Sequence, residues 1–202
     1  MQQFLPTADE VGTVVGNPLD LAGPAKTGGV EVLPSGIRDS AGATPLDCLG
    51  VVTPLMRVVY DNSGVRAVAW RDYSRFGAGL AVSSAEAGVV RLDSEEAAAR
   101  MFARFTTQWQ SCAGTTVTLH AGSGGLDLTA TDVRVDGPVL RATVLSDGGE
   151  GTVFPTEHAV GVARDCVVDV DVAITDPDPA RRLPATRAAD LVRVMLAKVD
   201  EG

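Results

Sequence analysis

The stretch VVRLDSEEAAARMFARFTTQWQSCAG, residues 89–114, passes from a strand pattern to a helix and then to a turn. Asp93 and Glu96 have the three-residue spacing of a capping box, which predicts a helix start. Apolar residues then recur every three or four positions up to Trp109 and Cys112, so one face of the helix is apolar. We expect this helix to pack against a sheet, with Trp109 and Cys112 in its buried stripe.

Strand patterns lie on both sides of this helix. Before it, runs rich in valine and tyrosine predict strands near 55–61 and 65–74, joined by a hairpin at Asn62-Ser63-Gly64, and a further strand at 86–92. No connection between the later strands is long enough for a crossover helix, which indicates antiparallel pairing. Five strands are expected after the helix, at 115–121, 126–135, 138–146, 152–162 and 165–174.

The two ends of the chain add further helices. Thr7 and Glu10 form a second capping-box pattern, which predicts a helix over about 8–15. Residues 17–47 are rich in Gly, Pro, Ser and Thr without a sustained period, so a loop-rich segment is expected there. Apolar spacing predicts a last helix over about 184–199.

These elements predict an α+β fold, with residues 1–202 as a single domain. A central antiparallel sheet is packed by two to three helices. We expect the helices at about 94–112 and 184–199 to cover the same face of the sheet, which leaves the other face free to form a cleft.

Composition limits the possible partners. The 202 residues carry a net charge of -9, and no stretch gathers lysine and arginine into a basic patch, so a nucleic-acid partner is not expected. The apolar runs are far shorter than the ~20 residues that cross a bilayer. The first residues lack a signal-peptide pattern, which leaves a cytoplasmic protein or a chain whose signal or anchor has been removed.

No motif in the chain predicts catalysis, a metal or a cofactor. His120 and His158 fall in separate expected strands without a nearby cysteine or carboxylate at ligand spacing, so both are interpreted as surface or edge residues. The glycine-rich pieces match neither a P-loop nor a dinucleotide fingerprint, and no nucleophile elbow is present. We therefore expect no catalytic residues, no metal site and no cofactor.

Polar side chains in two expected strands are the candidates for a ligand cleft. In CVVDVDVAI, residues 166–174, strand alternation places Asp169 and Asp171 on one face, where they could act as an acid/base pair or could simply face solvent. Alternation also places Trp70 and Tyr73 on opposite faces unless a bulge intervenes. The candidate ligand-binding residues are Trp70, Tyr73, Arg141, Asp169 and Asp171.

The three cysteines allow more than one interpretation. A bridge between Cys48 and Cys112 would tie the loop-rich segment to the end of the long helix, and it could stabilise the fold by ~4 kcal/mol on the chain-entropy model. Cys166 shares a strand face with valines and is expected to be a buried thiol. Spacing alone does not establish a pairing, and three reduced cysteines also suit a cytoplasmic protein.

Three segments together resemble the PknH-like family of extracellular sensor domains and related lipoproteins. They are DCLGVVTPLMRVVY at 47–60, the helix stretch at 89–114 that ends in Trp-x-x-Cys, and HAVGVARDCVVDVDVA at 158–173. The likeness extends over nearly the whole chain. It implies an α+β domain outside the cytoplasmic membrane, with an antiparallel sheet, flanking helices and a ligand cleft.

The resemblance also implies a disulfide between Cys48 and Cys112, with Trp109 packed over it. Relatives carry a second bridge, but here the matching positions are Thr156 and Ala173. This difference implies that Cys166 is unpaired.

The function implied is a noncatalytic extracytoplasmic ligand-binding sensor domain, of a surface lipoprotein or of a receptor kinase. Its partner would be a small molecule or cell-envelope ligand, with the membrane reached only through a removed anchor. Two alternatives remain: a hydrolase that uses carboxylates such as Asp169 and Asp171, and a protein-interaction module that takes a partner chain at a sheet edge or groove.

Overall fold

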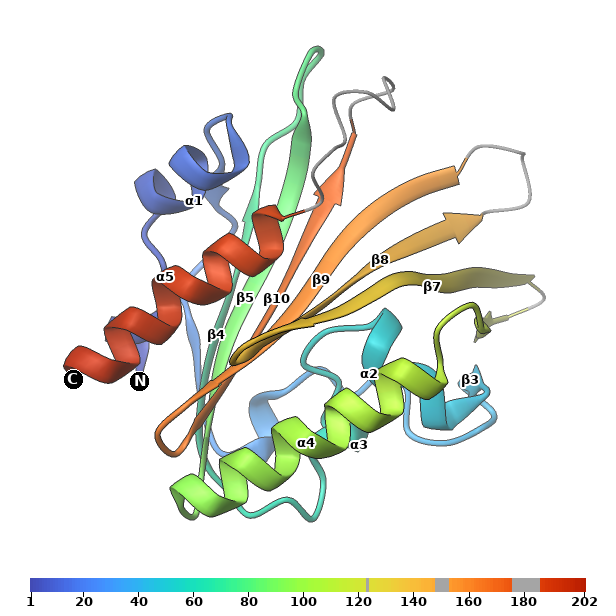
Figure 1. The fold of residues 1–202 in the computed structure, drawn as a ribbon. Coiled ribbons are helices and arrows are strands. Elements are labelled where there is room, and N and C mark those ends of the chain that lie inside the picture. The colour runs from blue at the N-terminus through green and yellow to red at the C-terminus, as the bar shows by residue number, and fades with distance from the viewer. Residues whose placement is uncertain (123, 148–152, 176–185) are drawn as a thin grey trace.

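The computed structural model describes residues 1–122, 124–147, 153–175 and 186–202 (Figure 1). Over these residues the strands form one sheet of ten strands, and all the recorded pairs are antiparallel. The order along the sheet is β1-β4-β5-β10-β9-β8-β7-β6-β3, with β2 also paired to β4. The predicted α+β class with a central antiparallel sheet is confirmed.

The sheet has long central strands and very short edge strands. The central strands are β4 (Val65–Ser74), β5 (Val82–Leu92), β6 (Thr116–Ala121), β7 (Gly124–Asp136), β8 (Val139–Asp147), β9 (Val153–Ala163) and β10 (Cys166–Ile174). The short strands are β1 (Asp20–Leu21), β2 (Lys26–Gly28) and β3 (Ala43–Thr44). All three short strands come from the segment that the sequence predicted to be loop-rich.

The helices stand outside the sheet. They are α1 (Ala8–Val15), α2 (Leu49–Val52), α3 (Arg57–Tyr60), α4 (Glu95–Ser111) and α5 (Arg187–Glu201), with 3-10 turns η1 (Gln2–Phe4), η2 (Val30–Val32) and η3 (Leu46–Cys48). The predicted capping box of α1 is present. In the described part of the chain, no helix is both long and apolar enough to span a membrane.

Helices α4 and α5 cover opposite faces of the sheet, so the prediction that they share one face is wrong (Figure 1). Sheet residues such as Val160 and Val167 pack with Phe105 and Trp109 of α4. We call this the α4 face. The next residues along the same strands, such as Val168 and Val170, pack with Leu191, Val192 and Met195 of α5. We call this the α5 face. Both faces of β10 are therefore buried along most of the strand, and a sheet buried on both faces needs a cover on each side.

A glycine on each face allows a close approach by the covering layer. A Cβ at Gly161 would lie 2.5 Å from a Val192 methyl carbon of α5. A Cβ at Gly88, on the other face, would lie 2.5 Å from a Leu55 methyl carbon. Contacts this short do not occur between real carbon atoms, so a larger residue at either position would displace these side chains of the covering layers.

Two local predictions are wrong. Residues 55–61 are not a strand but include the short helix α3, and Asn62-Ser63-Gly64 leads from α3 into β4 instead of closing a hairpin. The α4 cap is Ser94, whose hydroxyl accepts from the Ala97 N–H, one residue after the predicted Asp93. Residues 55–61 contact the sheet through the Leu55 N–H and the Tyr60 hydroxyl, which both donate to Asp169 of β10. The local sequence pattern does not contain these long-range contacts.

Candidate functional site

A buried polar network links the α4 face to the segment between α2 and α3. The Asp169 carboxylate accepts hydrogen bonds from the Tyr60 hydroxyl at 2.7 Å and the Leu55 N–H at 2.9 Å. Its second oxygen lies 2.8 Å from His158 Nε2, while His158 Nδ1 lies 2.8 Å from the Val51 carbonyl. His158 and Asp169 are 1% and 3% exposed, so this network is shielded from solvent.

The partners of His158 define its charge. A carbonyl oxygen only accepts, so Nδ1 must donate to Val51, and an ionised Asp169 requires Nε2 to donate as well. Burial alone would lower the pKa of His158, but the Asp169 charge and hydrogen bond, together with the Val51 carbonyl, raise it overall. The raised pKa favours the imidazolium form of His158, and its hydrogen bonds to Asp169 and to the Val51 carbonyl hold the α2–α3 segment against the sheet.

Trp109 and the disulfide close this network from the side of α4. The Trp109 ring centre lies 4.5 Å from that of His158, within reach of a cation–π contact with the imidazolium. Cys48 and Cys112 form a disulfide with a Cα–Cα distance of 5.6 Å, as the family resemblance implied. Cys166 is a free, buried thiol. Trp109 belongs to the same apolar cluster as the bridge.

Next to this network, three carboxylates lie side by side across neighbouring strands. Asp72 is directly opposite Glu86, and Glu86 is directly opposite Asp171. Asp171 is in turn opposite His158. Side chains at directly opposed positions have Cβ atoms about 5 Å apart and point to the same face. We call Asp72, Glu86 and Asp171 the carboxylate row.

The environment of the row shifts the ionisation of two members. Burial, with the charges of Asp171 and Asp72, raises the pKa of Glu86 to about 8. Burial also raises the pKa of Asp171 to about 6, against the opposing effect of His158. Glu86 Oε1 is buried without a hydrogen-bond partner among the described residues. The raised pKa values mean that burial disfavours the charged form of Glu86 and Asp171, and one buried oxygen of the row has no partner in the described residues.

Asp72 marks the solvent-exposed end of the row. Its side chain is 41% exposed and lies 3.8 Å from Lys26 Nζ of β2. The Lys26 ammonium also stands 3.5 Å from the centre of the Trp70 ring. The Trp70 indole N–H donates to the Val32 carbonyl at 2.8 Å. The carboxylate row thus runs from an exposed rim at Lys26 and Asp72 inward to His158.

The five predicted ligand-binding residues do not line one cleft. Trp70, Asp169 and Asp171 belong to the α4 face, where Trp70 and Asp169 are buried with partners of their own. Tyr73 is fully buried on the α5 face, and its hydroxyl donates to the Pro6 carbonyl. Arg141 is also on the α5 side of the sheet and is paired with Asp132 at 3.1 Å. No bulge lies between Trp70 and Tyr73, so strand alternation separates them.

Sequence reasoning missed the residues that complete the site. The expectation that His158 is a surface residue is wrong, whereas His120 is exposed beside β3, where it meets the Thr44 hydroxyl. Glu86 and Asp72 were not candidates because their neighbours come from distant strands. An indirect signal was present, since Asp169 and Asp171 alternate with valines in a strand that has few other polar residues. No three His, Cys, Asp or Glu side chains of the described ranges are arranged to hold a metal ion.

Comparison with known proteins shows which family the chain belongs to. The model of the PknH-like extracellular domain matches residues 1–198. The chain belongs to the PknH-like extracellular domain family. The family places this PknH-like domain outside the cytoplasmic membrane.

One solved structure shares the fold of the PknH-like domain. The crystal structure of the extracellular domain of PknH from Mycobacterium tuberculosis superposes with a TM-score of 0.82 at 22% identity, covering 100% of this chain and 95% of that one. An uncharacterised protein from Mycobacterium smegmatis gives a TM-score of 0.41 at 13% identity, with 88% and 90% covered. The search of curated proteins gave no match.

The PknH-like domain also keeps the geometry for the second bridge that the resemblance implied. Thr156 and Ala173, the positions without cysteine, are directly opposite each other on β9 and β10. Both are partly exposed on the α4 face. Thr156 is two residues from His158 on β9, and Ala173 is two residues from Asp171 on β10. The bridge is absent while its place in the strand register is preserved.

Proposed function

We propose that this chain is a noncatalytic extracytoplasmic ligand-binding sensor domain, of a surface lipoprotein or of a receptor kinase. The ligand would contact the carboxylate row from the rim at Lys26 and Asp72. The carrying observation is the buried Glu86 oxygen, which has no hydrogen-bond partner in the described residues. An unpaired buried acceptor costs about 1–3 kcal/mol, and a bound donor would recover that cost.

The chemistry of the row selects the ligand class. Asp72, Glu86 and Asp171 offer only acceptors when ionised, so they favour a group with several N–H donors, such as an ammonium or guanidinium. Lys26 at the rim, held over the buried Trp70 ring, supplies a cation, which suits a polar ligand with both a positive and a negative group.

A thermal-shift screen tests the proposal with amino sugars and with diamino acids, which carry both charges. We expect binders of the wild-type chain to lose their stabilising effect on Glu86→Gln/Asp171→Asn and to keep it on the control Asp136→Asn/Asp190→Asn. The control carboxylates pair with Arg193 on the α5 side. If binders stabilise the row variant as strongly as the wild type, the row is not the site.

A hydrolase is the second candidate, because Glu86 and Asp171 differ in pKa and occupy directly opposed positions. A carboxyl group protonated near neutral pH beside an ionised one is the arrangement used for general acid and base catalysis. Turnover of envelope glycans or esters that disappears in Glu86→Gln would favour this candidate. Saturable binding without turnover favours the sensor.

A further inference from the structure

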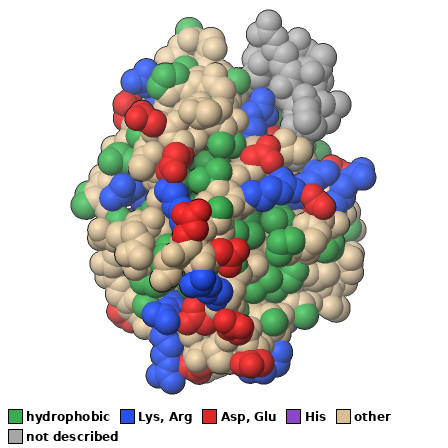
Figure 2. All heavy atoms as spheres, turned by 60° about the vertical axis from the view of Figure 1, so that its left-hand side comes forward, with side chains coloured by type: hydrophobic (Ala, Val, Ile, Leu, Met, Phe, Trp, Pro, Cys, Tyr) green, Lys and Arg blue, Asp and Glu red, His purple; other side chains and the backbone are tan. Residues whose placement is uncertain are grey.

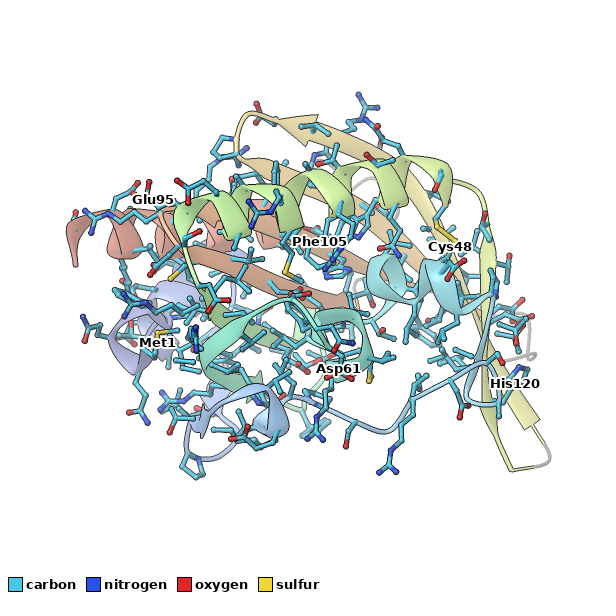
Figure 3. The ribbon with its side chains drawn as sticks, turned by 90° about the horizontal axis from the view of Figure 1, so that it is seen from below. Met1, Cys48, Asp61, Glu95, Phe105 and His120 are labelled. Atoms are coloured by element: carbon cyan, nitrogen blue, oxygen red, sulfur yellow. A yellow bond between two sulfur atoms is a disulfide. The ribbon has the colours of Figure 1, made fainter. Side chains whose placement is uncertain are left out.

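Four arginines from three segments of the chain gather beside α3 and α4. Every described lysine and arginine is within 4.0 Å of an Asp or Glu oxygen except Arg38, Arg57, Arg71, Arg100 and Arg104. Arg71 belongs to β4. The other four line three hollows on one side of the molecule. The segments that carry them lie side by side below the sheet (Figure 3).

The three hollows are joined through shared residues. Arg100 and Arg104 line the first, of about 340 Å³, together with Asn62 and Ser63. Arg104 also lines the second, of about 180 Å³. The second shares Val58 with the third, of about 360 Å³, which Arg38 and Arg57 line. The three hollows therefore adjoin one another along α3 and α4, and we call them together the arginine groove.

Three of the four guanidinium groups donate hydrogen bonds to neutral oxygens. Arg104 donates to the Ser63 hydroxyl at 2.9 Å, and Arg38 donates to the Ser35 carbonyl at 3.3 Å. Arg57 donates to the carbonyls of Glu31 and Leu33, and its Nε is buried without a partner. The charges of two nearby carboxylates act on them, Glu31 on Arg57 and Glu96 on Arg100, without an ion pair in the described residues. N–H donors therefore remain for an anion. Arg100 and Arg104, four residues apart on α4, repel each other.

The other residues of the groove limit the class of ligand that it can bind. Two carboxylates, Asp47 and Asp61, line the second and third hollows, and they would repel a chain with a charge on every unit. They can instead accept hydrogen bonds from hydroxyl groups. Apolar side chains such as Met101 and Val58 offer surface for carbon-bound hydrogens. The opposite side of the molecule, around α1 and α5, shows acidic and basic side chains interspersed (Figure 2).

We propose that the arginine groove binds an extracytoplasmic polymer in which phosphodiester groups are separated by neutral, hydroxyl-bearing units. The arginines bind successive phosphates through their paired N–H groups, and Asp47, Asp61 and Gln108 bind the hydroxyls between them. This surface shares no lining residue with the carboxylate row. The domain would thereby be held against an anionic polymer while its row stays open to a smaller ligand.

Fluorescence anisotropy with a labelled poly(glycerol phosphate) oligomer tests the groove. We expect saturable binding that weakens about tenfold between 50 and 200 mM salt. Arg100→Gln/Arg104→Gln should weaken it at least about tenfold, because both exposed arginines contact phosphates. The control Arg134→Gln/Arg193→Gln removes the same charge from ion pairs elsewhere and should change binding less than about twofold.

Several outcomes would overturn the proposal. They are an absence of binding at 50 mM salt, equal loss in the control variant, and binding of inorganic phosphate as tight as that of the oligomer. Preference for oligoglutamate would assign the groove to an acidic peptide, and equal binding to phosphatidylglycerol vesicles would assign it to a membrane surface. A neutral dextran oligomer should not bind.

Discussion

The two faces of the sheet are formed by the same strands, but one is apolar and the other carries buried ionisable side chains. Under α5, the side chains of β10 are Val168, Val170 and Val172, and they meet an apolar helix. Under the α2–α4 layer, the alternate residues Asp169 and Asp171 carry charge into the interior. A buried charge costs several kcal/mol unless it is paired. The α5 face therefore provides stability, whereas the α4 face combines stability with the groups that suit a ligand.

The difference also separates two kinds of polar residue on the α4 face. Asp169 has three hydrogen-bonding neighbours and is part of the framework. Glu86 has a buried oxygen without a partner in the described residues. A satisfied buried group is explained by structure alone, but an unsatisfied one needs a further reason, such as a ligand.

The largest effect should come from removing the disulfide that anchors the α4 face. Cys48→Ser/Cys112→Ser opens a loop with a sequence separation of 64 and should lower the free energy of unfolding by about 4 kcal/mol. Urea denaturation measures this, and hydrogen exchange should show α2 and α3 losing protection before α5. Equal loss of protection on both faces would contradict the assignment of the bridge to one face.

Asp169→Asn should be the next largest change. It leaves the buried His158 without its counter-charge and should destabilise the fold by about 3 kcal/mol. The matched control is Asp171→Asn, on the same strand and face, whose pKa is raised because burial outweighs the opposing charge of His158. Denaturation curves at pH 7 should separate the two variants. If Asp171→Asn is as damaging as Asp169→Asn, the framework extends into the row.

The carboxylate row should give the domain an unusual pH dependence. The folded protein binds the Glu86 proton more tightly than the unfolded chain does, because burial raises this pKa from 4.5 to about 8. Its contribution is therefore fully present below pH 4.5 and is lost as pH rises through about 8. Glu86→Gln should be more stable than wild type by about 2 kcal/mol above pH 8. Thermal melts from pH 5 to 9 measure it, and parallel curves for the two proteins would refute it.

The smallest effect should come from restoring the second bridge. Thr156→Cys/Ala173→Cys places cysteines at directly opposed positions and should add about 1 kcal/mol, less than the chain-entropy value because engineered bridges carry strain. Mass mapping of an unreduced digest should find one new bridged peptide pair. A pair that contains Cys166 instead would show that the register of β9 and β10 differs from that described here.

Most strands and the two long helices follow from local pattern, since alternation and helical spacing survive in the folded chain. The side of the sheet on which a helix packs does not follow, because it depends on the path of the connection. The row and the arginine groove could not be predicted for the same reason: Glu86 and Asp171 are joined by strand pairing, and Arg38 and Arg104 by the packing of distant segments. Asp169 and Asp171 were found because they interrupt a valine strand.

The short strands β1, β2 and β3 have a consequence for the solubility of the domain. Residues 20–44 supply the outermost strands at both ends of the sheet, so one N-terminal segment covers the free backbone of β4 and of β6. Exposed strand edges are templates for the pairing of one molecule with another, and very short edge strands limit such pairing. The least regular part of the chain thus acts as protection against aggregation, at both open ends of the sheet at once.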